Sequence, residues 1–304
     1  MSNPEHQHPN LLANPEIEAC LEFHERESRS AIRASFNGLV RDVPGESTAI
    51  VNALSQQLIH QINLVIPNAL VSCDDLNVDL GDAAFPLVQP PAKEALKRAI
   101  AARGITMVIN SSYRTIAQQM LLFNWYDGIS AVAFPGSSNH QSGLALDIED
   151  PRGWEPYLIA QNWYPLAGDP PHFDYVGGGT KDIRSTAILA FQKLWNKNHP
   201  NQRITEDGIY SRGGETESAL NLSPAKGFPK APWDEQPRVL RLCKPWMEGT
   251  DVEWLQKCLK NAGITVSTDG VFGPGTDKAV KEFQQKKNLT ADGIVGTETR
   301  QQLA

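Results

Sequence analysis

Residues 138–147 read SNHQSGLALD, and residues 168–175 read GDPPHFDY. Together they contain three side chains of the kinds that bind zinc in proteins, namely His140, Asp147 and His172. A catalytic zinc typically has three protein ligands with nitrogen or oxygen donors and one open position. The two segments therefore predict a catalytic zinc centre, around which the rest of the chain is organised.

The hydrophobic pattern around these ligands predicts short strands. In residues 144–150 (LALDIED), leucine and isoleucine alternate with Ala145 and Asp147, so Asp147 faces away from the apolar side. Residues 171–175 (PHFDY) form a second predicted strand, and residues 153–164 between the two strands have a helical pattern. Short strands connected in this way favour an α+β domain with a small antiparallel sheet and flanking helices.

A further helix and strand precede the predicted zinc centre. Residues 91–103 contain a proline near the start and are followed by Gly104, which is the usual asymmetry of helix ends. Residues 105–110 (ITMVIN) have the β-branched composition of a short buried strand, and another helix is expected at 116–128. Arg114 stands between this strand and that helix, placed either to meet an anion or to form an ordinary ion pair.

Three short segments resemble a family of zinc peptidases that act on bacterial peptidoglycan. They are SSYRT (111–115), SNHQSGLALD (138–147) and DPPHF (169–173). The family includes vancomycin-resistance-type D-alanyl-D-alanine carboxypeptidases and phage L-alanyl-D-glutamate endopeptidases. Its signature S-x-H-x-x-G-x-A-x-D is matched in full from Ser138 to Asp147.

The resemblance implies roles for six side chains. It implies that His140, Asp147 and His172 bind one catalytic Zn²⁺. Asp169, three positions before the last ligand, would be the general base. Arg114 would stabilise the oxyanion or hold the substrate, and Ser138 would contact the substrate.

The scissile bond stays open between two possibilities. Aspartate at position 169, followed by Pro-Pro-His, resembles the phage endopeptidases, because many carboxypeptidases of the family carry glutamate there. Residues 134–150 (FPGSSNHQSGLALDIED) instead resemble the carboxypeptidases. We expect a D-alanyl-D-alanine carboxypeptidase, with an L-alanyl-D-glutamate endopeptidase as the alternative and a non-catalytic cell-wall-binding protein as a third possibility.

The second half of the chain contains a loose internal repeat. Asp-Gly turn signals, each before a predicted helix, occur within residues 191–210, 268–273 and 282–296. Three short helices are predicted between residue 239 and the end of the sequence. This part resembles the three-helix peptidoglycan-binding module found on many cell-wall hydrolases, so peptidoglycan is expected to be both substrate and anchor.

These observations predict five regions along the chain. The first has helices expected at about 15–35 and 47–64, and its role is not readable from the sequence. The predicted regions are a helical N-terminal segment (1–80), a zinc peptidase domain (81–178), a degenerate half of the peptidoglycan-binding unit (183–222), a proline-rich linker (223–237) and an all-α peptidoglycan-binding domain (238–304). The glycine-rich residues 176–182 are expected to be a flexible boundary.

Composition limits the other classes of function. The 304 residues include 40% apolar and 21% charged residues, which is ordinary for a protein with real hydrophobic cores. The net charge of −7 lacks the basic character of a nucleic-acid-binding domain. No transmembrane segment or signal peptide is visible. Because the implied substrate lies outside the cytoplasmic membrane, we expect the protein to act there, with its export route and oligomeric state left open.

The four cysteines, Cys20, Cys73, Cys243 and Cys258, form no C-x-x-C pair, which argues against a cysteine-built zinc site. Cys243 and Cys258 lie in the same predicted terminal domain. They are expected either to form a disulfide in an oxidising compartment or to remain free thiols.

Overall fold

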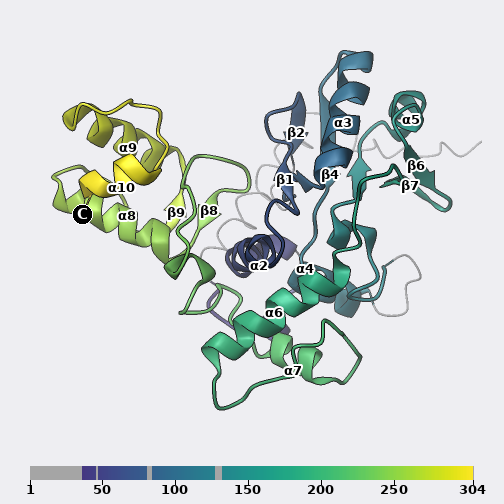
Figure 1. Ribbon diagram of the computed structural model, residues 1–304, viewed down its shortest axis with the longest axis horizontal. Coiled ribbons are helices and arrows are strands. Elements are labelled where there is room, and N and C mark those ends of the chain that lie inside the picture. Colours follow the sequence, from purple (N-terminus) through teal and green to yellow (C-terminus); the bar gives the residue numbers. More distant parts are fainter. Residues whose placement is uncertain (1–35, 46, 81–83, 127–131, 304) are drawn as a thin grey trace, which may run out of the picture. The chain divides into compact units, whose positions relative to one another are not determined.

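The computed structural model describes residues 36–303, apart from 46, 81–83 and 127–131. The helix expected at 15–35 lies outside the described residues, as does Cys20. The fold of the described part is α+β, as the sequence predicts (Figure 1).

A five-stranded sheet with the order β2-β4-β5-β7-β6 forms the centre of the first half. The strands are β2 (Val78–Leu80), β4 (Met107–Ser111), β5 (Ala145–Ile148), β6 (Trp163–Leu166) and β7 (Asp169–Tyr175). Neighbouring strands are antiparallel except β2 and β4, which are parallel. The sheet is therefore mixed at this edge rather than purely antiparallel, because helix α3 (Pro90–Arg103) lies between the two strands and crosses back, as a parallel connection requires. Since β2 lies at 78–80, the sheet also includes residues before position 81.

Two helices cover one face of this sheet. The buried residues of α3 recur at helical spacing and form a single apolar stripe: Ala92, Ala95, Leu96, Ala99 and Ile100. They share a core with α5 (Pro151–Ile159) and with sheet residues that include Leu146, Ile148 and Phe173. Because neighbouring strand residues point to opposite faces, the residues between these apolar ones face away from α3 and α5.

Helix α5 is shorter than the expected 153–164. It ends at Ile159, and Trp163 begins strand β6 instead. Asn162 lies between them in the left-handed conformation, with φ of 63°, which an asparagine tolerates better than most residues. The aromatic residues at the end of the helical pattern belong to the strand, where Trp163 is fully buried.

A second group of helices packs together, although the helices come from distant parts of the sequence. The expected helix at 47–64 is a 3-10 turn, Thr48–Val51, continued by α2 (Asn52–Val65). It packs mainly against α6 (Arg184–Asn198), and both contact α4 (Ile116–Trp125). The remaining short elements of this half are the 3-10 turn Val40–Asp42, the β1–β3 pair (Val71–Ser72 with Leu87–Val88) and α7 (Glu215–Asn221).

The segment 223–237, expected to be a linker, is packed against α2. Phe228 and Trp233 are almost completely buried. The side-chain amide of Gln57 donates to the carbonyl of Phe228 at 2.9 Å and accepts its N–H at 2.8 Å. Proline-rich composition therefore marks an irregular but fixed segment at this place.

The C-terminal part consists mainly of three helices around their own core. They are α8 (Thr250–Asn261), α9 (Pro274–Lys286) and α10 (Thr297–Leu303). A small antiparallel pair, β8 (Met247–Glu248) with β9 (Val271–Phe272), accompanies them, so the part is not purely helical.

A hydrogen-bond network built on one buried glutamine links α6 to α7. Gln192 donates from Nε2 to Asp207, to the carbonyl of Ile209 and to the hydroxyl of Thr216, at 2.8, 3.3 and 3.0 Å. Its Oε1 accepts the N–H of Gly208 at 2.8 Å. One side chain thus ties an Asp-Gly turn to the helices before and after it.

The same network occurs twice more in the C-terminal part. It links α8 to α9 through Gln256, with Asp269, Gly270, Val271 and Thr276, and α9 to α10 through Gln284, with Asp292, Gly293, Ile294 and Thr299. The loose repeat seen in the sequence therefore corresponds to three copies of one structural unit.

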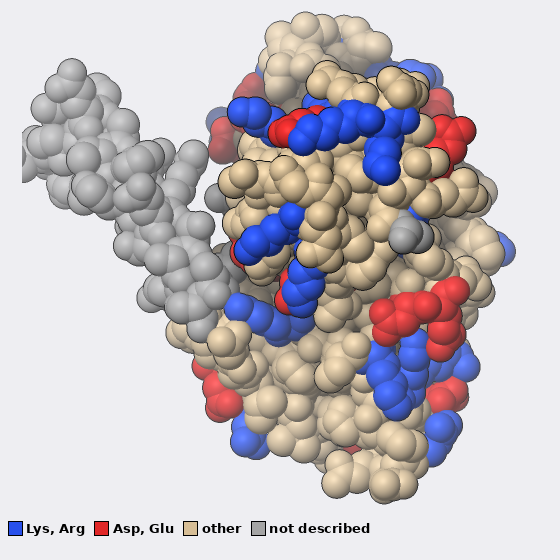
Figure 2. Space-filling view, turned by 90° about the vertical axis from the view of Figure 1, so that its left-hand side faces the viewer, with Lys and Arg blue, Asp and Glu red and all other residues tan. Residues whose placement is uncertain are grey.

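Charges on the face shown in Figure 2 are mixed, with Lys and Arg side chains next to Asp and Glu in several places. No helix within the described residues is long and apolar enough to cross a membrane. Cys73, Cys243 and Cys258 are free thiols, so the structure has no disulfide between Cys243 and Cys258.

Candidate metal centre

Three neighbouring strands place polar side chains in one row of the sheet. Ser111 of β4 is paired with Asp147 of β5, and Asp147 is paired with His172 of β7. The residues that flank the row, Leu146 and Phe173, point into the core beneath α3 and α5. The row therefore lies on the opposite face of the sheet, as the alternation in residues 144–150 predicts for Asp147.

His140 reaches this row from a short 3-10 helix, Asn139–Ser142, directly before β5. Gly143 ends the helix with φ of 68°, and a Cβ atom there would lie 2.5 Å from Leu70. Both the left-handed conformation and the close approach require glycine. Gly143 thus sets the turn between the helix that carries His140 and the strand that carries Asp147.

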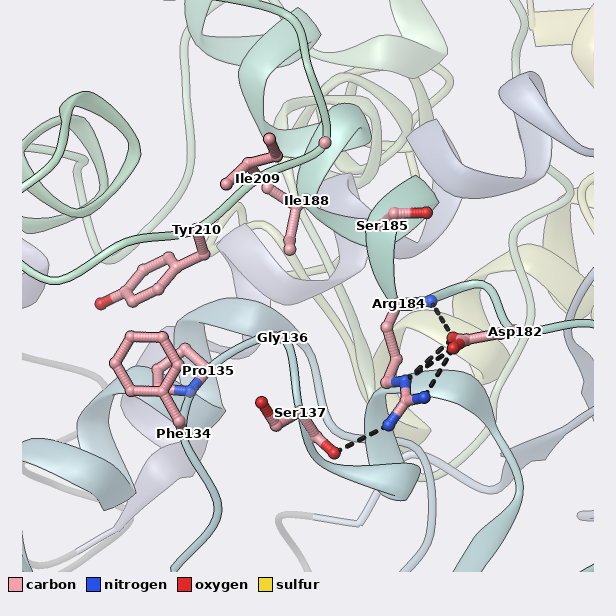
Figure 3. Close-up of a pocket in the computed structure, with 11 residues that line it drawn as sticks. Phe134, Pro135, Gly136, Ser137, Asp182, Arg184, Ser185, Ile188, Ile209 and Tyr210 are labelled. Carbon is pink, nitrogen blue, oxygen red and sulfur yellow. Dashed lines mark hydrogen bonds and ion pairs between the residues drawn. The ribbon is translucent and has the colours of Figure 1, made fainter.

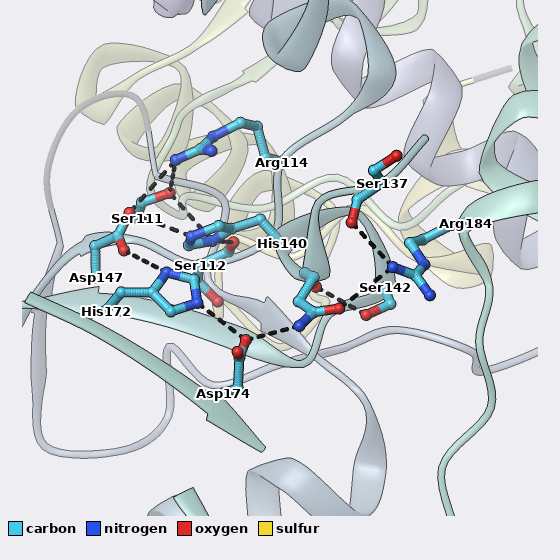
Figure 4. Close-up of polar contacts among 11 residues, drawn as sticks. Ser111, Ser112, Arg114, Ser137, His140, Ser142, Asp147, His172, Asp174 and Arg184 are labelled. Carbon is cyan, nitrogen blue, oxygen red and sulfur yellow. Dashed lines mark hydrogen bonds and ion pairs between the residues drawn. The ribbon is translucent and has the colours of Figure 1, made fainter. Parts of the chain in front are cut away.

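The three predicted ligands converge, as Figure 4 shows. Nε2 of His140 lies 3.3 Å from Oδ2 of Asp147, and Nδ1 of His172 lies 3.1 Å from Oδ1 of the same carboxylate. The two imidazole rings are 5.0 Å apart and nearly perpendicular. One donor atom from each residue lies within 4.8 Å of the other two.

The remaining nitrogen of each histidine is held by another group. Nδ1 of His140 lies 2.7 Å from the carbonyl oxygen of Ser112, and Nε2 of His172 lies 2.9 Å from Oδ1 of Asp174. Asn139 in turn donates to Asp174 at 3.0 Å. A carbonyl or carboxylate that accepts one ring N–H fixes the tautomer and turns the other nitrogen's lone pair toward a metal.

The protonation states fit a metal site. Burial and the nearby charge of Arg114 lower the pKa of His140, which keeps it neutral. Burial alone would raise the pKa of Asp147, but hydrogen bonds from both histidines lower it far below its usual range. Burial also works against protonation of His172, yet Asp147 and Asp174 raise its pKa to about 9. A metal would therefore bind an ionised Asp147 and displace a proton from His172.

This donor set fits zinc. Two imidazole nitrogens and one carboxylate oxygen are among the usual ligands of a catalytic zinc with an open position. The outer hydrogen bonds to Ser112 and Asp174 add the orientation that such ligands require. Among the described residues, this is the one group of three such side chains that could hold a metal ion.

Arg114 lies against the cluster, with its side chain 18% exposed. Its guanidinium donates to Ser111 at 2.9 Å, to Gln119 at 3.1 Å and to Asp147 at 3.4 Å. Burial lowers the pKa of Arg114, while the negative charges of Asp147 and Asp169 act in the opposite direction. The arginine is thus held beside the ligands.

Asp169 is the first residue of β7 and is half-buried. The hydrogen bonds of the described residues include none to its carboxylate, in contrast to Asp147 and Asp174. Ser138 is buried immediately before the 3-10 helix, and its hydroxyl makes no hydrogen bond to the three ligands within the described part of the chain. The structure therefore brings the ligands and Arg114 together, with Ser138 beside them in sequence.

The outer partners of the two histidines were not predicted from the sequence. Asp174 has a local signal, because it lies two positions after His172 on a strand and so shares its face. Ser112 acts through its backbone carbonyl, for which residue type gives no signal. Ser111 depends on the register between β4 and β5, which only the folded sheet defines.

Two family models match this chain. Residues 89–164 match a model described as D-alanyl-D-alanine carboxypeptidase, and residues 248–303 match a putative peptidoglycan binding domain. The first match includes Arg114, His140 and Asp147, and ends before Asp169 and His172. The second covers α8, α9 and α10.

Several curated proteins are similar to parts of the chain. The N-acetylmuramoyl-L-alanine amidase CwlL of Bacillus licheniformis is 35% identical over 117 residues, which is 33% of this chain and 31% of that protein. The spore cortex-lytic enzyme of Bacillus cereus is 48% identical over 56 residues, 18% of this chain and 22% of that protein. The amidase CwlH of Bacillus subtilis (strain 168) is 43% identical over 64 residues, 17% and 24% of the two chains. The chain thus spans less than a third of the length of these relatives.

Proposed function

We propose that this chain is a zinc-dependent peptidase of the peptidoglycan stem peptide, because residues 89–164 match the D-alanyl-D-alanine carboxypeptidase model and residues 248–303 match a putative peptidoglycan binding domain. The observation that carries this proposal is the convergence of His140, Asp147 and His172 within 4.8 Å. A wall-binding protein without catalysis has no need of such a cluster.

In the proposed site, His140, Asp147 and His172 hold one Zn²⁺, and Asp174 and the carbonyl of Ser112 hold the histidines. Zinc supplies a Lewis acid that makes a peptide carbonyl more susceptible to attack by water. Because the pKa of Asp147 is low, its ligand oxygens are ionised over the ordinary pH range.

Asp169 is proposed as the general base. Its carboxylate is not engaged in hydrogen bonds with other described residues, so it is available to take a proton from the attacking water and return it to the leaving amine. Arg114 is proposed to stabilise the negative charge that develops on the carbonyl oxygen. Ser138 is proposed to contact the substrate next to His140.

We propose the terminal D-alanyl-D-alanine bond as the bond cleaved, in line with the family that residues 89–164 match. The second candidate is the L-alanyl-D-glutamate bond. A carboxypeptidase needs a cation for the terminal carboxylate in addition to the group that stabilises the oxyanion, and Arg114 is proposed for the oxyanion, which favours this second candidate.

The C-terminal domain is proposed to anchor the enzyme to the wall. Its positive and negative side chains are intermixed, so attachment would depend on local recognition rather than on overall charge. The proposed place of action is outside the cytoplasmic membrane, where peptidoglycan lies.

The test is a digest of defined muropeptides with zinc-loaded protein, analysed by mass spectrometry. Loss of one alanine from the pentapeptide is the expected result, and release of the stem after L-alanine would instead support the second candidate. Cleavage between the sugar and L-alanine, as in an amidase, would contradict both. Asp169→Asn should retain zinc and lose turnover, whereas Asp79→Asn, an exposed aspartate on β2, serves as the matched control.

A further inference from the structure

A pocket near the metal centre lies between the peptidase domain and the first repeat unit. It has a volume of about 420 Å³, within the roughly 300–1,000 Å³ of sites for small ligands. One wall is the loop at 134–137, and the other is the start of α6 with residues 208–210, which continue the Asp-Gly turn. Figure 3 shows the two walls facing each other across the pocket.

The first wall is tied to the metal centre. The N–H of Gly136 donates to Gln141, the neighbour of ligand His140, at 2.7 Å. Arg184 at the start of α6 donates to the carbonyl of Ser137 at 2.9 Å and to Asn139 at 3.5 Å.

From Asn139, hydrogen bonds lead through Asp174 to His172, and Figure 4 shows the contact between Asp174 and His172. The loop at 134–137 that lines the pocket therefore runs into the 3-10 helix that carries His140.

The second wall has a counterpart in the peptidoglycan-binding domain. Its turn, Asp207-Gly208-Ile209, makes the same glutamine-centred network as the turns at Asp269 and Asp292. Two of these three networks lie in the segment that matches the peptidoglycan-binding family. The first copy presents its turn toward the peptidase domain instead.

The lining combines apolar surface with a neutralised polar edge. Phe134 and Tyr210 pack edge to face with ring centres 5.3 Å apart, and Ile209 leaves 60% of its surface exposed. At the other side, Arg184 is paired with Asp182 at 2.6 Å, so this edge carries little net charge. Such a lining suits a neutral ring with an apolar face and an acetyl methyl group better than it suits a charged peptide.

We propose that this pocket binds an N-acetylated sugar of the glycan strand whose stem peptide enters the metal centre. This inference rests on the proposed function, because it takes peptidoglycan as the substrate. The first repeat unit then acts as a substrate subsite of the peptidase domain rather than as a second wall anchor.

The first experiment locates the sugar on the full-length protein. The probe is a peptide-free β-1,4-linked N-acetylglucosamine tetramer with a photoreactive diazirine on one acyl group, and labelled residues are mapped by mass spectrometry. Labels on residues 134–137 or 208–210 are expected. Labels confined to residues 238–303 would overturn the proposal. If no muropeptide is hydrolysed, the proposed function fails, while this map still decides the sugar site.

The second experiment compares a stem peptide attached to its disaccharide with the same peptide free of sugar. The measured quantity is kcat/KM for the peptide with its disaccharide divided by kcat/KM for the free peptide. Ile209→Ser should lower this ratio about fivefold, as expected for losing part of an isoleucine's apolar contact. Ile105→Ser is the matched control, because Ile105 is also exposed and precedes β4 outside the pocket. Its ratio should equal that of the wild-type protein, and an unchanged ratio in Ile209→Ser would contradict the proposal.

Discussion

The metal cluster and the three glutamine networks are both buried polar assemblies, but they are completed in different ways. Each glutamine side chain forms hydrogen bonds with groups in the next 24 residues of the sequence, and these include the polar groups of an Asp-Gly turn. The metal cluster draws on β4, β5, β7 and the 3-10 helix, and leaves two imidazole nitrogens and a carboxylate facing one point.

The difference distinguishes structural from functional polar groups. A network in which every polar group has a partner stabilises a local unit. In the metal cluster, one nitrogen of each histidine is held by a hydrogen bond, while its other nitrogen and the carboxylate of Asp147 converge. Such an arrangement of ionisable groups is suited to binding a metal. The following predictions test whether the two assemblies can be separated by mutation.

The largest effect is expected from His172→Ala. This variant removes one of the three proposed zinc ligands, and the loss of several kcal/mol of transition-state stabilisation lowers turnover by at least about 10³-fold. Zinc content by atomic absorption and muropeptide turnover should fall together. If the variant kept wild-type zinc content and turnover, His172 would not be a zinc ligand of the proposed site.

The counterpart in the glutamine networks is Gln284→Ala. The variant removes the side-chain amide that accepts the N–H of Gly293 and donates to Asp292. Because these groups lose their hydrogen bonds, the C-terminal domain should lose about 3 kcal/mol of unfolding free energy. Urea unfolding followed by tryptophan fluorescence measures this loss, and zinc content should match that of the wild-type protein.

The matched control is Gln285→Ala, the exposed neighbour on the same helix, which should be close to neutral. Equal losses in the two variants would show that the network does not stabilise the domain.

A smaller effect is expected from Asp174→Asn. The amide can still accept the N–H of His172, but the negative charge that favours this orientation is lost. Zinc affinity, measured by competition with a chelating dye, should fall about tenfold. The exposed Asp79→Asn on the same sheet should leave zinc affinity unchanged, and an equal effect of both would argue against a specific role for Asp174.

The smallest expected effect is on how the stability of the C-terminal domain depends on pH in the acid range. Backbone N–H groups and the network glutamines donate to Asp207 and Asp292, which lowers the pKa of both carboxyls. Because the unfolded value is about 3.9, this stabilisation is present above that pH and is lost as the pH falls through the lower folded value. The urea midpoint of the C-terminal domain should therefore decline less between pH 5 and about pH 3 in Asp292→Asn than in the wild-type protein. Identical declines would show that the turn carboxylate is not linked to stability.

Much of this organisation can be predicted from the sequence because it depends on local patterns. Proline and Gly104 bound the helix at 90–103, alternation assigns Asp147 to the polar face, and the Asp-Gly signals mark all three repeat units. Residue types and the family resemblance of the two segments predict His140, Asp147 and His172 as a candidate ligand set. For the helix, the strand and the Asp-Gly turns, the decisive neighbours lie within a few residues of one another.

Only the tertiary structure decides the features that depend on distant partners. The parallel edge strand β2, the packing of Phe228 on Gln57, and the carbonyl of Ser112 beside His140 all join residues that are far apart in sequence. The placement of the first repeat unit against the loop at 134–137 is of the same kind, and it creates the pocket. Residue types determine what each unit can form, whereas register and the burial of the remaining apolar faces determine where the units meet.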